Sequence, residues 1–401
     1  MPETTTRGRT QLGPALTLIH TGRAPTRAAL GTQLGVTRAT AGAVAAELRA
    51  LGLIQVDTTP AGGTLGRPSH RLMIDPDGPV ALGAQIHPDG FQVALVGLGG
   101  RIVTAVASDQ AVPDDPESAL ALVAEAAAGL LRSEGRACVG AGLAVPSAVA
   151  EPDGCAVSPL YLGWPTGTPV RDMFTAQIQR AGITGPAGAA LACVAANDIN
   201  LAALAEHRHG AGRGAGYLLV VATGHRGVGG AFVLGGRLYT GSSGLGMEAG
   251  HVSVNPRGRA CRCGSRGCLN VETDALSFMD AAGRVPQPDV PVLRQATDLL
   301  RDEFADPAVR GAAAILIDRL GLGLAGLANV LNPDRILLGG LHGELLAADP
   351  ERLRAAVGQR SPWGRGSSIP LLTCALDNGG LVGAAELAWL PVLETPEILN
   401  G

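Results

Sequence analysis

One histidine and three cysteines that could ligate a metal fall within eighteen residues of the chain: His251, Cys261, Cys263 and Cys268. Three thiolates and an imidazole complete a tetrahedral shell for Zn²⁺, and a site whose four positions are all taken by protein is structural. Gly258, Gly264 and Gly267 would let the chain turn tightly enough to bring the ligands onto one ion. The alternative is a group of surface thiols in a flexible loop, but three of the seven cysteines lie within eight residues, which favours zinc.

A second pair of polar residues, Asn197 and Asp198, opens a helix that we expect over residues 199–207. An Asn-Asp pair in this position is an ordinary helix N-cap. An amide and a carboxylate also suit sugar hydroxyls, because each hydroxyl offers one donor and one acceptor. The residue types alone leave both interpretations open.

The run Glu248-Ala-Gly-His251, followed by Cys-x-Cys-Gly-x-x-Gly-Cys-Leu, resembles the ROK family of repressors and sugar kinases. The resemblance implies that Glu248 and His251 bind sugar hydroxyls and that His251 also ligates the zinc. It implies the same sugar-binding role for Asn197 and Asp198, the aspartate being the general base in the kinases. With both motifs in one chain, sugar contact is the favoured interpretation of the pair.

One position departs from the family pattern. The family usually follows Gly-Cys-Leu with a glutamate that contacts the sugar, whereas this chain has Asn270 there and Glu272 two residues later. Either residue could take the place of the usual glutamate.

Composition places the chain among globular proteins of two or three domains. It has 401 residues, 46% of them hydrophobic and only 3% aromatic, so aliphatic side chains must fill the cores. No basic-then-apolar leader and no run of eighteen apolar residues is present, so we expect a cytoplasmic protein without a membrane partner. Four cysteines outside the cluster are expected to be buried free thiols in a reducing compartment: Cys138, Cys155, Cys193 and Cys374.

The first 80 residues are mildly basic, with eight arginines against five acidic residues, in a chain of net charge −4. Three helices are predicted there, over residues 14–20, 26–34 and 37–51, and strands 53–56 and 70–74 would pair around a glycine-rich wing at 58–68. This order is typical of a winged helix-turn-helix domain that binds DNA. The alternative is a helical cap for packing or dimerisation.

The third predicted helix would carry the DNA contacts. Thr37 caps it, and Arg38 and Thr40 begin its outer face, in the turn that enters the major groove in this class of domain. The head resembles that of the repressor branch of the family, which the kinase branch lacks. The resemblance implies that Arg67, in Gly-Arg-Pro, approaches the minor groove.

Two similar α/β halves follow a segment at 75–79 that is a hinge by composition. The first half is predicted to hold strands at 80–87, 91–97, 101–107 and 137–144 and helices at 117–133 and 169–181. The second is predicted to hold strands at 217–222, 227–234, 237–239 and 335–338 and helices at 292–305, 308–331 and 380–390. The family resemblance implies a two-lobed actin-like, hexokinase-like (ribonuclease H-like) fold with a ligand cleft between the lobes. We expect domains at 1–75, 79–195 and 196–401, with the C-terminal helix packing on the first lobe.

The first hairpin of the body decides whether phosphoryl transfer is expected. The kinases of the family have Asp-x-Gly-Gly-Thr there, which anchors Mg²⁺ and lets backbone amides approach the phosphates. This chain reads Gly83-Ala-Gln-Ile-His-Pro-Asp-Gly90, without a glycine pair or threonine, and Pro88 removes an amide. Two further glycine turns, at 223–230 and 338–340, resemble the rest of an ATP site but are also ordinary turns. We therefore predict no enzyme activity.

Together these features predict a sugar-responsive transcriptional regulator, a repressor of carbohydrate uptake or catabolism genes. It would bind operator DNA with its head and a sugar or sugar phosphate in its cleft, as a homodimer or higher homo-oligomer with one structural zinc per chain. The alternatives are an ATP-dependent sugar kinase with an accessory head and a scaffold without a ligand.

Overall fold

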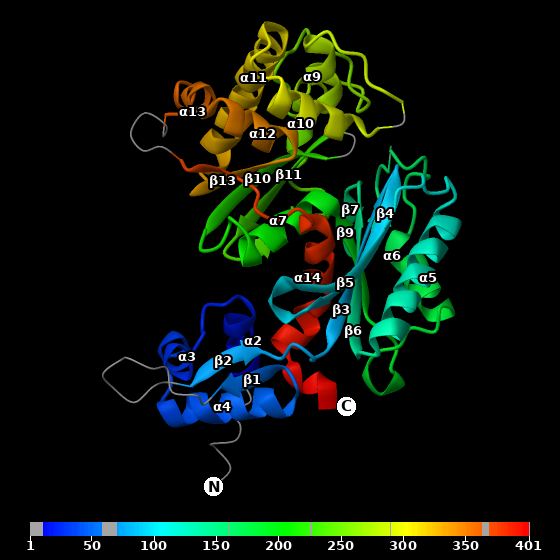
Figure 1. Ribbon diagram of the computed structural model, residues 1–401, viewed down its shortest axis with the longest axis vertical. Coiled ribbons are helices and arrows are strands. Elements are labelled where there is room, and N and C mark those ends of the chain that lie inside the picture. The colour runs from blue at the N-terminus through cyan, green and yellow to red at the C-terminus, as the bar shows by residue number, and fades with distance from the viewer. Residues whose placement is uncertain are drawn as a thin grey trace.

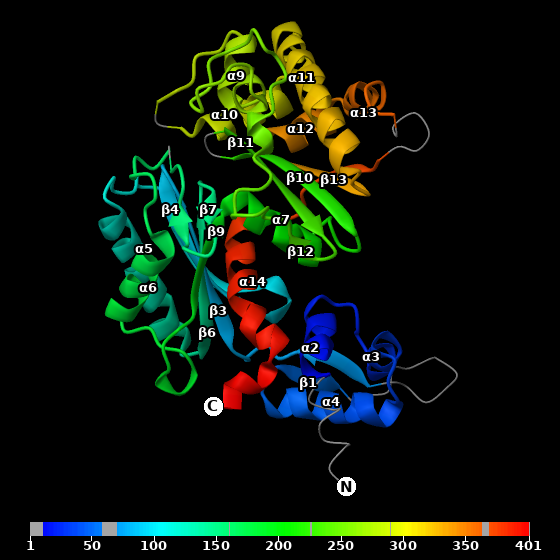
Figure 2. The same ribbon diagram turned by 180° about the vertical axis from the view of Figure 1, so that it is seen from behind.

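The structure is a computed structural model that describes residues 11–57, 70–159, 161–224, 227–288, 290–362 and 369–400. These residues form three parts, which Figure 1 shows in one view and Figure 2 from behind. The head contains the first described residues, and two α/β lobes follow it. The C-terminal helix runs from the region between the lobes to the head.

The head consists of three helices and a two-stranded antiparallel sheet: α2 (Leu12–His20), α3 (Arg27–Leu34), α4 (Arg38–Ala50), β1 (Ile54–Asp57) and β2 (Arg71–Ile74). Thr26 caps α3, because its hydroxyl accepts from the backbone N–H of Ala29 at 3.1 Å. Gly35 ends that helix in the left-handed conformation, with φ of 65°. The predicted helices and strands are present, and the expected wing at 58–68, with Arg67, lies outside the described residues.

The first lobe is built on a five-stranded sheet in the order β5-β4-β3-β6-β9. Its elements are β3 (Val80–His87), β4 (Gly90–Gly97), β5 (Arg101–Ser108), α5 (Pro116–Glu134), β6 (Cys138–Val145), α6 (Val170–Arg180) and β9 (Cys193–Asn197), with a small hairpin of β7 (Val149–Ala150) and β8 (Cys155–Ala156). β3 and β4 are antiparallel, whereas β3 pairs β6 and β6 pairs β9 in parallel. β9 was not predicted, and it continues across residue 195, where we expected the first lobe to end.

The second lobe repeats this plan with the strand order β12-β11-β10-β13-β14. The predicted elements are α7 (Asp198–His209), β10 (Tyr217–Gly224), β11 (Gly227–Leu234), β12 (Arg237–Leu238), α10 (Val292–Asp302), α11 (Pro307–Leu331) and β13 (Arg335–Gly339). Short elements that we did not predict complete it: α8 (Leu269–Glu272), α9 (Ala275–Ala281), α12 (Leu341–Ala348), α13 (Pro350–Gly358) and β14 (Leu371–Thr373).

Helix α11 is the one described helix whose length and composition would allow it to cross a membrane. Its side chains Leu316, Leu320 and Leu324 are fully buried in the main core of the second lobe. Packing inside the lobe therefore explains the apolar character of this helix.

Helices α7 and α14 (Gly379–Glu394) lie side by side between the two sheets. They touch backbone to backbone, since a Cβ on Gly383 would lie 1.9 Å from the carbonyl oxygen of Leu201. α14 also covers the face of the first sheet, where a Cβ on Gly142 would lie 1.9 Å from the carbonyl oxygen of Ala384. Glycine at these positions allows the two helices and the sheet to approach this closely.

The head is docked firmly on the body. Leu12 and Leu16 of α2 share one hydrophobic core with Trp389 of α14, and the Trp389 indole N–H donates to the carbonyl of Val96 at 3.0 Å. The segment at 75–79, a hinge by composition, is hydrogen-bonded at both ends: Asp75 N–H donates to the Leu53 carbonyl at 3.1 Å, and the Arg136 guanidinium donates to the Gly78 carbonyl. One hydrogen bond ties the segment to the head and the other ties it to the first lobe.

The expectation for the four remaining cysteines is also corrected. Cys138 is buried, as predicted, whereas Cys155, Cys193 and Cys374 are partly exposed. Cys155 lies in the β7–β8 hairpin and Cys193 begins β9 at the edge of its sheet, so neither has neighbours on all sides. All seven cysteines are free thiols.

Candidate functional site

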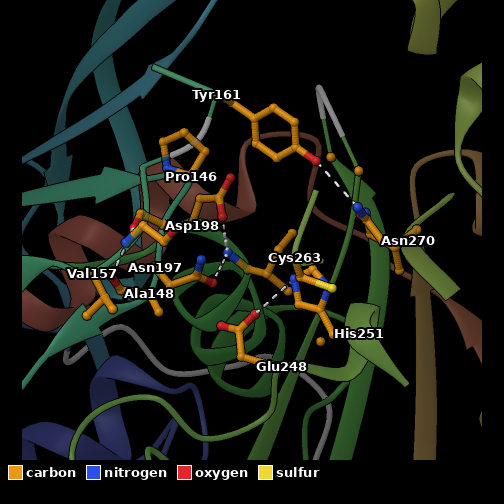
Figure 3. A pocket seen from close by; sticks show the side chains of 18 of the residues that line it. Pro146, Ala148, Val157, Tyr161, Asn197, Asp198, Glu248, His251, Cys263 and Asn270 are labelled. Carbon is orange, nitrogen blue, oxygen red and sulfur yellow. Dashed lines mark hydrogen bonds and ion pairs between the residues drawn. The ribbon is translucent and has the colours of Figure 1, made fainter. Parts of the chain in front are cut away.

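A cavity of about 530 Å³ lies between the two lobes, and residues of both contribute to its walls. Figure 3 shows the side chains that converge on it. All four residues to which the family resemblance gave a sugar-binding role line it: Asn197, Asp198, Glu248 and His251. Its volume suits a monosaccharide-sized ligand with room for ordered water.

Asn197 and Asp198 reach the cavity because β9 ends there and α7 begins. The Asn197 side-chain oxygen accepts from the backbone N–H groups of Ile199 and Asn200, at 3.0 and 3.1 Å, and so caps α7. The cap uses only the carbonyl oxygen, which leaves the amide group for a ligand. Burial raises the pKa of the Asp198 carboxyl to about 6. The cap interpretation is therefore correct for Asn197, and it does not compete with ligand binding.

Glu248 and His251 come from the loop after β12. Partial burial raises the pKa of Glu248, and the charge of His251 opposes that rise. The Glu248 Oε2 atom lies 3.9 Å from Nε2 of His251. The imidazole thus presents Nε2 to the cavity side of the loop and keeps Nδ1 for its other neighbours.

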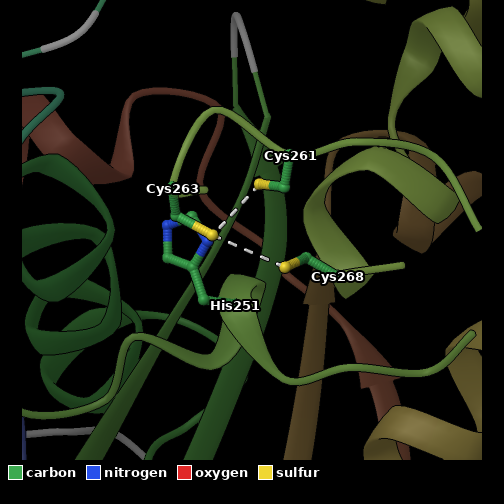
Figure 4. Close-up of side chains that lie close together, drawn as sticks. All are labelled: His251, Cys261, Cys263 and Cys268. Atoms are coloured by element: carbon green, nitrogen blue, oxygen red, sulfur yellow. Dashed lines mark hydrogen bonds between the residues drawn. The ribbon is translucent and has the colours of Figure 1, made fainter. Parts of the chain in front are cut away.

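Those neighbours are the three cysteines of the motif, which Figure 4 shows around the His251 ring. The ligand atoms of His251, Cys261, Cys263 and Cys268 all lie within 4.8 Å of one another. His251 Nδ1 is 3.7 Å from Cys261 Sγ, and Cys263 Sγ is 3.7 Å from Cys268 Sγ. Tetrahedral zinc with Zn–S bonds of the usual length separates two sulfurs by about 3.7 Å. The donor set and its spacing therefore fit a metal ion of this size.

The glycines of this loop serve two different needs. Gly264 and Gly267 have φ of 90° and 62°, in the left-handed region that favours glycine. Gly258 has no such angle. A Cβ there would instead lie 2.0 Å from Glu272 Oε1, so this glycine allows a close approach of the loop to a buried carboxylate.

The structure distinguishes Asn270 from Glu272. Asn270 lines the cavity, where its side-chain oxygen accepts from Val228 N–H at 2.5 Å and its amide donates to the Tyr161 hydroxyl at 3.4 Å. Glu272 is buried beneath the metal loop, paired with Arg319 at 2.8 Å and bound to the backbone N–H of Arg259 at 2.9 Å. Asn270 is thus the residue at the cleft, and Glu272 supports the loop.

Sequence reasoning missed Tyr161, Arg262 and His87, which also line the cavity. The Arg262 guanidinium lies 5.4 Å from the centre of the Tyr161 ring, so the pair reaches across from one lobe to the other. Arg262 stands between two metal-binding candidates in Cys-Arg-Cys, and Tyr161 is one of three tyrosines in an aromatic-poor chain. These two signals were present in the sequence.

Two of the three turns weighed as phosphate sites, at 83–90 and 223–230, contribute residues to the cavity wall. His87 pairs with Gly90 in the β3–β4 hairpin, and Pro88, which has no backbone N–H, lines the cavity beside His87. Gly224 and residues 227–230 line the cavity from the second lobe, and residues 225–226 lie outside the described residues. Gly340 has φ of 57°, and a Cβ there would lie 2.2 Å from the Thr223 carbonyl oxygen.

The candidate DNA-contacting residues of the head lie at the start of α4. Thr37 caps this helix, its hydroxyl accepting from Thr40 N–H at 3.2 Å, and the two threonine hydroxyls lie 2.9 Å apart. Arg38 is exposed. Thr40 therefore serves the cap with its hydroxyl, and Arg38 is the freer of the two for an external contact.

The two-sheet body with its central cleft is an actin-like, hexokinase-like fold. Residues 82–389 match the ROK family, and the chain belongs to that family.

Relatives of both kinds are found. A glucokinase of Thermotoga maritima is 28% identical over 326 residues, which are 76% of this chain and 96% of the glucokinase. The DNA-binding transcriptional dual regulator NagC of Escherichia coli K12 is 28% identical over 212 residues, 49% of each chain. Among solved structures, a ROK glucokinase of Streptomyces griseus in complex with glucose and AMPPNP has a TM-score of 0.63 and 25% identity, covering 77% of this chain and 98% of its own.

A ROK transcriptional regulator described as a homolog of the E. coli MLC protein covers 98% of this chain and 100% of its own, with a TM-score of 0.74 and 20% identity. At this identity the likeness concerns the fold alone. That fold includes the head as well as the body.

Proposed function

We propose that this protein is a sugar-responsive transcriptional regulator, a repressor of carbohydrate genes, that binds DNA with its head and a sugar or sugar phosphate in its cleft. The observation that carries the proposal is that one chain contains both the head and the cleft, with the head packed on the body that forms the cleft. The family match begins at residue 82, and the glucokinase of known structure covers 77% of this chain, whereas the MLC homolog covers 98%. The chain therefore extends beyond the kinase body by a head of the kind that the regulator has.

The head is, in this proposal, a winged helix-turn-helix domain. Its second and third helices are joined at Gly35, and the exposed Arg38 begins the third, where a guanidinium can bind guanine in the major groove. Thr37 and Thr40 would hold this turn and reach a phosphate. Arg67 is proposed to approach the minor groove.

The cleft is proposed as the sugar site. Asn197 and Asp198 on one side and Glu248 and His251 on the other supply amide, carboxylate and imidazole groups at hydroxyl-binding positions. Zn²⁺ held by the three cysteines and His251 Nδ1 would be structural, and it would fix the ring so that Nε2 faces the sugar. Asn270 adds an amide where a carboxylate is usual in the family.

We infer that the sugar is bound without being phosphorylated. Phosphoryl transfer depends almost wholly on positioning and on charge stabilisation of the phosphates, and the His87-Pro88 turn offers neither a glycine pair nor the amide of residue 88. The second candidate function is a sugar kinase, favoured by the likeness to glucokinases and by the Asp198 pKa of about 6, which suits a general base.

In a homodimer, sugar binding would act by population shift. Closure of the cleft would favour one arrangement of the two heads, and only one arrangement matches the spacing of the DNA half-sites.

DNA binding tests the proposal. Fluorescence anisotropy with the DNA upstream of the chain's own gene should show specific binding that a sugar alters. Arg38→Ala should weaken binding by about 1–3 kcal/mol and relax the base preference. The matched control is Arg49→Ala, which removes one positive charge from the exposed last turn of the same helix. Full binding and unchanged preference in Arg38→Ala would show that another face of α4 meets the DNA. Deletion of the head is a poorer test, because it would expose Trp389 and its neighbours on α14.

A further inference from the structure

A cluster of polar side chains outside the cleft lies where the head meets the body. Glu386 of α14 is fully buried, and side chains from two other helices bind its carboxylate. Nε2 of His20, the last residue of α2, lies 2.8 Å from Oε2. Nε2 of His209, the last residue of α7, lies 2.9 Å from Oε1, and Arg208 donates to Oε2 at 2.7 Å. We call these four residues the junction.

The first lobe takes part as well, through the turn between β4 and β5. The backbone N–H of Gly99 donates to Nδ1 of His20 at 2.9 Å, so the proton of this imidazole is on Nε2, which donates to Glu386. Gly100 packs against the His209 ring, since a Cβ there would lie 2.6 Å from its Cδ2 atom. The junction therefore joins the head, the first lobe, α7 and α14.

The junction is a hydrogen-bonded ion pair and not a second metal site. The ligand atoms of His20, His209 and Glu386 do lie within 4.8 Å of one another. However, 2.8 and 2.9 Å are hydrogen-bond lengths, and the Arg208 guanidinium already brings a cation to the same carboxylate.

Helix α7 connects this junction to the cleft. Asp198 is its first residue and lines the cavity, and His209 is its last, about 16.5 Å away along a twelve-residue helix. Near its end, Glu206 accepts from the backbone N–H groups of Ala375 and Leu376, both at 2.7 Å, on the segment that leads into α14. One rigid element thus has a proposed sugar ligand at one end and a head contact at the other.

We propose that the junction transmits the occupancy of the cleft to the head, through α7. This inference rests on the proposed function. When α7 shifts with sugar binding, Arg208 and His209 move relative to a carboxylate that water cannot reach. A buried charge cannot be left unpaired without a large loss of stability. When α7 shifts, the head either moves with it, because His20 stays bound to Glu386, or the hydrogen bonds of the junction break. In both cases the head changes between discrete positions.

Glu386→Gln tests the junction, because the amide keeps the shape of the side chain and removes its charge. Sugar affinity, DNA affinity and the change in DNA affinity caused by sugar are measured in the full chain, with D-glucose and N-acetyl-D-glucosamine as probe sugars and the upstream DNA. Coupling between two sites typically changes affinity about 5- to 150-fold. We expect the variant to bind both ligands like wild type and to lose the coupling to within about twofold of no effect. The matched control is Glu117→Gln, the same change in an exposed ion pair between Glu117 of α5 and Arg180 of α6. Figure 1 shows these two helices on the face of the first sheet opposite α14.

The outcomes separate this inference from the proposed function. If neither sugar binds to wild type or alters its DNA affinity, the proposed function fails for these sugars, and the junction then has no signal to carry. If wild type responds and Glu386→Gln responds equally, the junction is overturned and the regulator stands. Should Glu386→Gln fail to fold, His209→Phe keeps the ring against Gly100 and removes one hydrogen bond, and undiminished coupling in that variant overturns the inference as well.

Discussion

Asp198 and Glu386 are carboxylates on the two central helices, Asp198 partly exposed to the cleft and Glu386 fully buried, and their surroundings differ. Burial raises the pKa of Asp198 to about 6, and no cation lies among the causes of its shift. Burial alone would also raise the pKa of Glu386, but hydrogen bonds and electrostatic attraction from the His20 and His209 rings hold it well below its usual value. A carboxylate that lines a cavity without a cationic partner is a candidate for ligand binding. A carboxylate whose charge is balanced by a cation and hydrogen-bond donors has a structural role.

The largest effect should appear in stability. Glu386→Ala removes a fully buried carboxylate and leaves the Arg208 side chain, which is only 13% exposed, without its partner, so we expect a loss of about 3–5 kcal/mol in the free energy of unfolding. Asp198→Asn removes a charge that the folded state disfavours at neutral pH, so the free energy of unfolding of this variant should stay within about 0.5 kcal/mol of that of wild type. Urea denaturation at pH 7 measures both. Equal losses in the two variants would show that neighbouring groups stabilise the two carboxylates to the same extent.

A substitution in the metal cluster tests the cleft separately from the junction. Cys263→Ser removes an exposed ligand from the cluster that holds His251, so zinc should be lost and sugar affinity should fall about tenfold or more. Elemental analysis and a thermal-shift titration with sugar test the two results. The control is Cys155→Ser, at a partly exposed free thiol outside the cluster. Sugar binding that survives complete loss of zinc would separate the metal from the site.

The smallest effect is in pH dependence. Burial raises the folded-state pKa of Asp198 above its ordinary value of 3.8, so the carboxylate gains a proton as pH falls through about 6. A protonated acid accepts fewer hydrogen bonds from sugar hydroxyls, so affinity should fall by up to about tenfold per pH unit below 6. Glu248 is a second carboxyl group in the cavity whose pKa is raised. The part of the pH dependence that is due to Asp198 is therefore isolated by comparison with Asp198→Asn. Calorimetric titrations of both proteins that show the same pH profile would contradict this assignment.

Local patterns predicted much of this molecule. The strand at 227–234 has the predicted bounds, the two lobes and the head are present, and the metal motif and the Asn-Asp and Glu-x-x-His pairs converge on one cavity. These features succeed because short spacings and alternating apolar residues carry their information locally. That the two pairs share one site was implied by the family resemblance and not by local spacing.

Long-range pairings could not be predicted in this way. His20 and Glu386 are 366 residues apart, and a histidine at a helix end beside an apolar C-terminal helix has no sequence signal. Tyr161 and Asn270 each stand out in the sequence, but nothing in it predicts that residues 109 positions apart meet across the cleft. The short elements β9, α12 and β14 were missed because a few apolar residues do not distinguish a strand from a loop or a helix turn.

The central claim is that the cleft binds a sugar and does not phosphorylate it. Sugar-dependent ADP release, measured with ATP and Mg²⁺ over hexoses, N-acetylhexosamines and pentoses, tests it most directly, beside a thermal shift with the same sugars. The account predicts a sugar that raises the melting temperature and no ADP release above the sugar-free rate. Turnover near about 1 s⁻¹ or faster, abolished by Asp198→Asn, would contradict it and make the protein a kinase.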